Sequence, residues 1–310
     1  MSTWQYQRWD VFTDTVLAGN PLAVVIDAGN LTATSMQRIA GEFMLPETTF
    51  LCPTTVPAAD FRVRIFTPQR ELPMAGHPTV GTTFALARLG RIPPGTPRVT
   101  LQLGVGPTAV ELEWSGNQLA LAWMAQRDPD FSASCDEAAA LARVLRLVDT
   151  DIATDTAPAQ VVSSGVPFLF VPLCSRAAVD RAQLDRQALV DLCARLGTEE
   201  LPVYLFSTEA GADDVTTYSR MFAPVFGIAE DPATGGASGP LAAYLARYFP
   251  HRAPEDGRLQ SLQGVAMGRA SRIAISLSRA ESGTLHLKVG GASTWLGEGT
   301  FSLPPTRQPA

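Results

Sequence analysis

The chain has 310 residues, a length typical of two domains or of one duplicated unit. Hydrophobic residues make up 46% of it and charged residues only 17%, so much of the chain must be buried and disorder is excluded. The net charge of -6 argues against a nucleic-acid-binding protein, which needs a basic surface. We see neither a long apolar run nor a signal peptide, and therefore expect a cytoplasmic protein that does not enter a membrane.

Residue types that hold common cofactors are scarce. Lys288 is the only lysine, and it lies in an alternating strand pattern, which disfavours a pyridoxal-phosphate enzyme. The cysteines and histidines are scattered without metal-ligand spacing. The motif Gly104-Val105-Gly106 lacks the third glycine of a dinucleotide-binding fingerprint. We therefore expect no metal and no organic cofactor.

Short motifs recur in the same order at offsets of 146 to 156 residues. The matched segments are 19–25 with 165–171, 45–46 with 201–202, 64–68 with 220–224, and 77–78 with 231–232. Four matches in one order predict two copies of one α/β unit. We place the first domain at residues 1–130 and the second at 131–280, with carboxy-terminal strands in 281–310 that can cross back to the first domain.

Two predicted helices, 82–89 and 241–248, are rich in alanine and leucine and apolar on nearly all sides. Such helices need burial on every face, which strands wrapped around a central helix would provide. Three further helices carry charge on one face and are expected to cover the outside. They are 34–43, 136–147 and 186–196, with Thr34, Ser134 and Asp185 as their expected N-caps.

Small residues and prolines precede both central helices, at 76–78 and 231–237. The N-terminus of a helix presents backbone N–H groups and the positive end of the helix dipole. Two such termini facing each other across a cleft would suit a substrate carboxylate. The alternative is that these residues only cap two buried helices.

Three titratable residues of different kinds accompany these turns. Glu47 opens a strand of apolar and β-branched residues, and the matched position in the second copy is Val203. It is either an exposed edge charge or a half-buried acid with a raised pKa. With His77 and Asp231 at equivalent or adjacent turn positions, the set is what a proton transfer without a cofactor requires.

These segments together resemble the PhzF family of phenazine-biosynthesis enzymes, over nearly the whole chain. The motifs that carry the resemblance are Asp10-Val11-Phe12-Thr13, Pro46-Glu47-Thr48-Thr49-Phe50, Met74-Ala75-Gly76-His77-Pro78-Thr79-Val80-Gly81, Asp231-Pro232-Ala233-Thr234-Gly235 and Gln263-Gly264.

The resemblance implies an α/β fold of the diaminopimelate-epimerase type. Two similar pseudo-symmetric domains, each a barrel-like and mostly antiparallel sheet around a central apolar helix, would enclose a site in the cleft between them. It also implies a homodimer without a cofactor that isomerises trans-2,3-dihydro-3-hydroxyanthranilate by general acid and base catalysis. The residues implied are Glu47, His77 and Asp231 for catalysis and Gly76, Gly235, Gly236 and Ala237 for substrate binding.

Two departures from the family pattern bear on the substrate. Pro46 and Gly236 stand where the family often has serine, so two polar side chains are lost. The reaction type can survive such changes while the substrate differs. An epimerase or racemase for another small carboxylate therefore stays open, as does a binding protein without turnover. A thiol-based racemase would need paired cysteines at the two helix starts, where His77 and Asp231 stand instead.

Overall fold

The structure is a computed structural model that describes residues 2–252, 257–279 and 285–303. The chain forms two compact units. Unit 1 comprises Met1–Met124 with Gly291–Ala310, and unit 2 comprises Ala125–Gly290. Within the described ranges, every helix is too short or too polar to cross a membrane.

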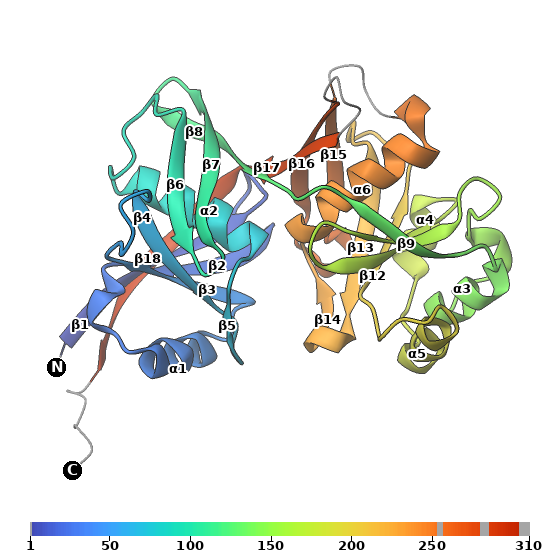
Figure 1. Cartoon of the computed structure of the whole chain (residues 1–310), viewed down its shortest axis with the longest axis horizontal. Helices are drawn as coiled ribbons and strands as arrows, with labels where there is room; N and C mark the ends of the chain where they lie inside the picture. Colours follow the sequence, from blue (N-terminus) through green and yellow to red (C-terminus); the bar gives the residue numbers. More distant parts are fainter. Residues whose placement is uncertain (1, 253–256, 280–284, 304–310) are drawn as a thin grey trace, which may run out of the picture. The chain divides into compact units, whose positions relative to one another are not determined.

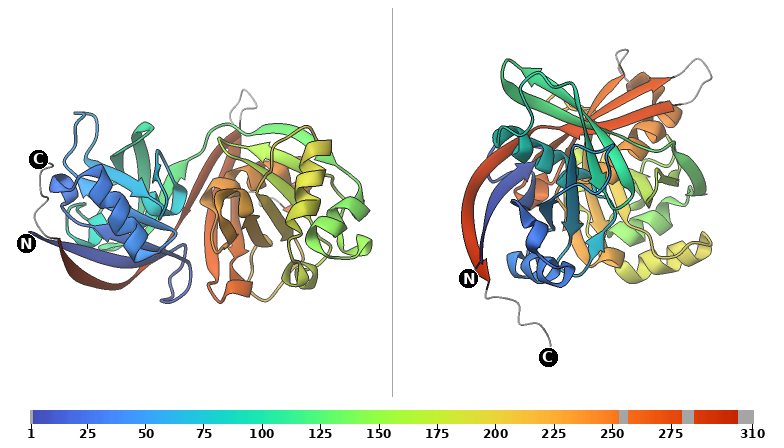
Figure 2. Two further views of the ribbon diagram at one scale, coloured as in Figure 1. Left: turned by 90° about the horizontal axis from the view of Figure 1, so that it is seen from below. Right: turned by 60° about the vertical axis from the view of Figure 1, so that its left-hand side comes forward.

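Over its described residues, unit 1 contains two α-helices and a sheet to which segments near both ends of the chain contribute. Its elements are β1 (Ser2–Val11), β2 (Asn20–Val25), α1 (Ala33–Phe43), β3 (Glu47–Cys52), β4 (Phe61–Phe66), β5 (Glu71–Leu72), α2 (Gly76–Arg88), β6 (Arg98–Leu103), β7 (Gly106–Ser115), β8 (Gln118–Ala125) and β18 (Ser293–Leu303). The strands β1 and β18 run side by side in both views of Figure 2. They pair from Ser2 with Leu303 to Val11 with Ser293, with one register shift between Arg8 and Trp9.

The sheet of unit 1 is mostly antiparallel. Strand β1 pairs with β2 and β18, β3 with β4, β4 with β5, and β6 to β8 follow in order, all antiparallel. The pairs β2–β3 and β4–β6 are parallel. The connection between each parallel pair contains a helix, as parallel strands require. Helix α2 is the buried one, with every residue from 77 to 86 buried, and it packs among the strands (Figure 1).

Unit 2 repeats this order of pairing. Its elements are β9 (Asp130–Cys135), α3 (Ala138–Leu145), β10 (Ala159–Ser163), β11 (Pro167–Pro172), α4 (Arg176–Arg181), α5 (Arg186–Arg195), β12 (Val203–Ser207), β13 (Thr217–Ala223), β14 (Ile228–Asp231), α6 (Gly235–Tyr248), β15 (Arg258–Gln263), β16 (Ser271–Arg279) and β17 (Leu285–Gly291). Here β11–β12 and β13–β15 are the parallel pairs, and the neighbouring pairs are antiparallel. Helix α6 takes the place of α2, which confirms the predicted fold of two similar units around central helices.

The structure corrects two of the three predicted N-caps. Helix α1 is capped by Thr32, whose hydroxyl accepts from the Ser35 N–H, and Thr34 lies inside the helix. Ser134 lies in strand β9 instead of capping α3. The prediction for α5 is confirmed, because the Asp185 carboxylate accepts from a first-turn backbone N–H.

Both central helices begin earlier than the sequence predicts. Helix α2 starts at Gly76 and α6 at Gly235, so Pro78 and glycines expected in a loop form the first helical turns. Proline is tolerated in a first turn because the N–H groups there have no partner within the helix. Small residues also allow close packing, since a Cβ built on Gly81 would lie 2.6 Å from side-chain atoms of Val11 and Leu22.

Candidate active site

Glu47 is the first residue of β3 and is largely buried. Helix α1 ends at Phe43, its C-cap residue Met44 adopts a left-handed conformation with φ of 50°, and the chain turns from there into β3. Leu22 of the parallel strand β2 is the register partner of Glu47. The side chain of Glu47 is 14% exposed, so it is not the exposed edge charge that the sequence left open.

His77 is the second residue of α2 and faces Glu47. Its Nε2 lies 3.1 Å from Oε2 of Glu47, and its side chain is 7% exposed. Burial lowers the pKa of His77 to about 3, and the positive end of the α2 dipole disfavours a cation in the same place. The imidazole is therefore neutral near pH 7, and the contact with Glu47 is not an ion pair in the ordinary sense.

A neutral imidazole next to a carboxyl group has a chemical consequence. It stabilises the carboxylate less than an imidazolium would, which suits a carboxyl group that must take up a proton and release it again. Oε2 and Nε2 lie 3.1 Å apart without the geometry of a hydrogen bond. The carboxyl group of Glu47 can act as a general base and, once protonated, as a general acid.

The start of α2 supplies backbone donors beside this pair. Gly76 and His77 are its first two residues, whose N–H groups have no acceptor within the helix. The N-cap residue Ala75 has no side chain that could satisfy them, and Pro78 has no N–H at all. The predicted donor Gly76 thus lies where an anion is favoured by the N–H groups and by the helix dipole.

Unit 2 has a second helix start of the same kind. The three predicted binding residues Gly235, Gly236 and Ala237 are the first three residues of α6. The N–H of Ala237 donates to the Thr234 carbonyl at 3.1 Å. The N-cap residue Thr234 makes no side-chain capping bond, so its hydroxyl is used elsewhere.

Asp231 ends strand β14, ahead of the turn into α6. Its Oδ2 accepts a hydrogen bond of 2.6 Å from the Thr234 hydroxyl. Its backbone carbonyl accepts one of 2.7 Å from Nε2 of Gln263, a side chain with no exposed surface. In the sequence, Gln263 stands out only as part of a family motif, and its place beside Asp231 was not predicted. A polar residue closing a buried strand was the available signal.

The structure corrects the predicted equivalence of His77 and Asp231. A Cβ built on Gly104, directly after β6, would lie 2.6 Å from Pro73, and one built on Gly264, directly after β15, would lie 2.6 Å from Pro232. The prolines before the two central helices are therefore the equivalent pair.

This equivalence places Leu72, not His77, at the position of Asp231, and Gly236 at the position of His77. The His-Pro and Asp-Pro dipeptides are similar in sequence, but one lies inside a helix and the other precedes one. The structure thus brings Glu47 and His77 together in unit 1, and Asp231, Thr234 and Gln263 together in unit 2. A cleft shared by all the predicted residues stays a prediction.

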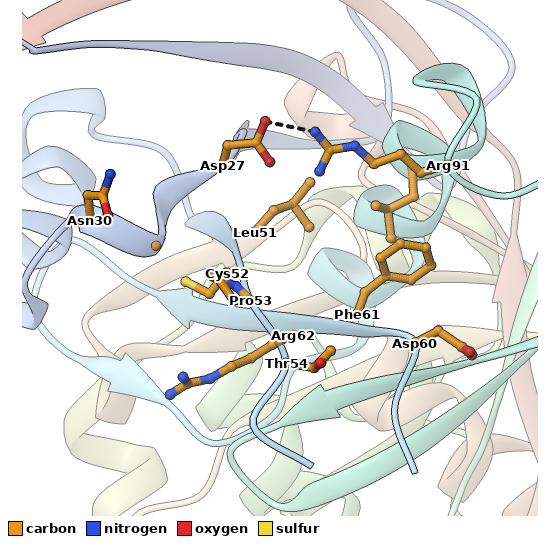
Figure 3. A pocket seen from close by; sticks show the side chains of 12 residues that line it. Asp27, Asn30, Leu51, Cys52, Pro53, Thr54, Asp60, Phe61, Arg62 and Arg91 are labelled. Carbon is orange, nitrogen blue, oxygen red and sulfur yellow. Dashed lines mark hydrogen bonds and ion pairs between the residues drawn. The ribbon is translucent and has the colours of Figure 1, made fainter. Parts of the chain in front are cut away.

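A cavity of about 390 Å³ lies elsewhere in unit 1. It adjoins Cys52, at the opposite end of β3 from Glu47, roughly 16 Å away at ~3.3 Å per strand residue. Figure 3 shows Asp27 and Arg91 pointing toward one another at its rim, with 2.8 Å between Oδ2 and the guanidinium. Asp27 is 71% exposed, so this ion pair contributes little to stability. The cavity is separate from the pair of Glu47 and His77.

The two similar units with central helices form a diaminopimelate-epimerase-like fold, and the named relatives of this chain include isomerases. The family model described as "Phenazine biosynthesis-like protein" matches residues 9–299, and the chain belongs to this PhzC-PhzF family. It is 37% identical over 299 residues to the trans-2,3-dihydro-3-hydroxyanthranilate isomerase of Pseudomonas chlororaphis, covering 95% of this chain and 98% of the relative.

Solved structures agree with this assignment. A PhzF-family phenazine biosynthesis protein of Bacillus anthracis superposes with a TM-score of 0.88 at 27% identity, over 98% of this chain and 100% of that one. A hydroxyproline epimerase of Agrobacterium vitis has a TM-score of 0.62 at 12% identity, over 99% and 93% of the two chains. The second likeness concerns the fold alone.

Proposed function

We propose that this protein moves a proton on a small carboxylate substrate without a cofactor, and that Glu47 is the group that carries the proton. The observation that supports this most directly is the 3.1 Å contact between the largely buried Glu47 carboxyl group and the neutral imidazole of His77. The name of the Pseudomonas chlororaphis relative adds support for trans-2,3-dihydro-3-hydroxyanthranilate as a substrate.

The chemistry follows from the positions of these groups. The Glu47 carboxylate removes a proton from a carbon atom of the substrate, holds it as a carboxylic acid and returns it to another carbon. His77 keeps the carboxyl group in place and, being neutral, does not oppose its protonation. Backbone N–H groups at Gly76, Gly235 and Gly236 bind the substrate carboxylate, whereas the Ala237 N–H already donates to the Thr234 carbonyl. Asp231 contributes to catalysis as a supporting carboxylate.

A second candidate substrate class is favoured by one observation. A Cβ built on Gly236 would meet no atom within 4 Å, so the serine usual in the family would fit there without strain. Its absence leaves space and removes a hydroxyl from the start of α6. An epimerase or isomerase reaction on a different or bulkier carboxylate uses the same proton transfer and fits this change equally well.

Proton exchange in deuterated water is the direct test. The purified protein is incubated with trans-2,3-dihydro-3-hydroxyanthranilate and with a panel of cyclic amino acids and hydroxy acids, and deuterium incorporation at carbon is measured by NMR. Exchange with at least one compound, lost in Glu47→Gln, is expected. Binding without exchange across the panel would identify a binding protein instead. Light scattering on the same sample tests the homodimer, which we propose as the assembly.

A further inference from the structure

The segments at and beside the two helix starts differ at three equivalent positions, and all three differ in the same way. The equivalent residues are confirmed by a second contact, because Thr79 Oγ1 donates to the Ala75 carbonyl at 2.7 Å and Ser238 Oγ donates to the Thr234 carbonyl at 3.0 Å. In this alignment, unit 1 is apolar where unit 2 is polar. The three pairs are Leu72 with Asp231, Ala75 with Thr234, and Leu103 with Gln263.

Both the oxygen and the nitrogen of the Gln263 side-chain amide form hydrogen bonds in unit 2. Its Oε1 accepts from the Thr234 N–H at 3.1 Å, while Nε2 donates to the Asp231 carbonyl at 2.7 Å and to the Thr234 hydroxyl at 3.0 Å. The opposite amide orientation would place an acceptor against the Asp231 carbonyl and a donor against the Thr234 N–H. The contacts therefore fix the amide orientation of Gln263.

This orientation determines where the hydroxyl proton of Thr234 goes. A hydroxyl has one proton to donate, and the Thr234 oxygen already accepts from Gln263. Its proton is therefore directed to Oδ2 of Asp231, at 2.6 Å. A donor held in this way favours the ionised form of a carboxyl group and commits Oδ2 to the role of acceptor.

We propose that Gln263 and Thr234 are positioning residues that hold the Asp231 carboxylate by Oδ2 and so fix its orientation for its part in the reaction. The proposal rests on the function proposed above for this family member. Unit 1 supports it as an internal comparison: where the carboxylate is absent, at Leu72, the threonine and the glutamine are absent as well.

Tyr204 is a titratable residue near Asp231. Tyr204 of β12 lies close enough to Asp231 for their charges to interact, and it is completely buried against Ser219 and Ser261. Burial raises the pKa of Tyr204 above its usual value, and the Asp231 charge raises it further. Tyr204 thus stays neutral throughout the pH range in which a carboxyl group titrates.

The test compares Thr234→Val, which removes the hydroxyl, with Thr234→Ser, which keeps it. The side-chain carboxyl signal of Asp231 is followed by ¹³C NMR against pH and assigned with Asp231→Asn. In Thr234→Val we expect the pKa of Asp231 to rise by about 1 to 2, and in Thr234→Ser to stay near that of the wild type. Loss of a helix cap cannot explain the difference, because Thr234 makes no side-chain capping bond.

Turnover supplies the second measurement. We expect kcat to fall about tenfold or more in Thr234→Val, with KM changed less because the backbone donors of α6 are retained, and to recover in Thr234→Ser. The variant Gln263→Glu, which cannot donate to Thr234, should change both readouts in the same direction. Gln160→Glu is the matched control, since Gln160 is a buried glutamine of the same unit that bonds to Ser132 and Tyr248 instead.

The proposal is overturned if Asp231 titrates in Thr234→Val as in the wild type, if Thr234→Ser shifts it as far as Thr234→Val, or if Gln160→Glu reproduces the effects of Gln263→Glu. Thermal unfolding shows whether each variant is folded. If Gln263→Glu does not fold, the comparison of Thr234→Val with Thr234→Ser decides the outcome by itself. The NMR titration needs no substrate. A wild-type protein without turnover would therefore contradict the proposed function while the titration still decides the role of Thr234.

Discussion

His77 Nε2 lies 3.1 Å from Glu47 Oε2, and the two residues reach this contact from different elements, the first turn of α2 and the first position of β3. Because burial lowers the pKa of His77 to about 3, the pair has no permanent positive charge near neutral pH. The neighbour of the Glu47 carboxyl group is thus a neutral polar side chain, which in the proposed reaction would not oppose protonation of Glu47.

Replacing Glu47 with glutamine should abolish most of the activity. Glutamine keeps the size and a hydrogen-bonding oxygen but cannot cycle a proton, so kcat should fall by about 10²- to 10⁴-fold, the usual contribution of a general acid or base. Glu42→Gln is the control, because Glu42 is an exposed glutamate on the preceding helix. The comparison is made on a verified substrate, with circular dichroism to show that both variants fold. Near-full turnover in Glu47→Gln would transfer the role to Asp231.

His77 should make the folded protein sensitive to acid. Its pKa is about 3 in the folded state and about 6.5 when unfolded, so between these values only the unfolded chain takes up the proton. This part of the stability is present above pH 6.5 and is lost as the pH falls toward 3. Between pH 7 and pH 5, we expect the wild type to lose about 2 kcal/mol more than His77→Gln in urea unfolding. Equal losses in the two proteins would show that His77 is not buried in its neutral form.

The serine usual in the family can be restored at position 236. A side chain fits there, since the Cβ would meet no atom within 4 Å, and the backbone of Gly236 does not have the positive φ that favours glycine. If Gly236 broadened or changed the substrate range, Gly236→Ser should raise kcat/KM for trans-2,3-dihydro-3-hydroxyanthranilate about tenfold, the value of one added hydrogen bond. Gly236→Ala separates the effect of the hydroxyl from that of the added carbon. An equal gain in both variants would refute a role for the hydroxyl.

The sequence predicted the general fold because its signals are local and repeated. The apolar runs at 82–89 and 241–248 identified both central helices, and motifs in matched order indicated two similar units. Where each helix starts was not predictable in this way. Gly76 and Pro78 are typical of loops, and only packing against other strands, seen for Gly81 against Leu22, makes a helix of this segment favourable.

The sequence predicted the part of the candidate site that has a local signal and missed the part that depends on contacts between distant residues. Glu47 could be selected because a single acid in an apolar strand is visible in the sequence. The roles of Thr234 and Gln263 depend on a contact between residues 29 positions apart, which no periodicity reveals. The similarity of the His-Pro and Asp-Pro dipeptides also suggested an equivalence that the packing of Gly104 and Gly264 on two prolines contradicts.

Gly264 should help to hold the turn that carries Asp231, through its close approach to Pro232. Its φ is 76°, and a Cβ there would lie 2.6 Å from both the Pro232 and the Arg269 carbonyl oxygens. Gly264→Ala should therefore cost more than the ~1 kcal/mol of a strained left-handed residue, and about 3 kcal/mol in total is expected because the clash is with backbone. Gly268→Ala is the matched control, since Gly268 has a φ of 68° but no atom within 4 Å of the added Cβ.

Urea unfolding at pH 7 measures the difference between the two variants. If the backbone clash displaces the turn, Gly264→Ala should also reduce kcat, whereas Gly268→Ala should lose only the ~1 kcal/mol of stability that its left-handed backbone costs. Equal destabilisation by the two substitutions would mean that the strain of a positive φ alone accounts for the effect. The close approach to Pro232 would then contribute nothing measurable, and the turn before α6 would have to be held by Gln263 without help from Gly264.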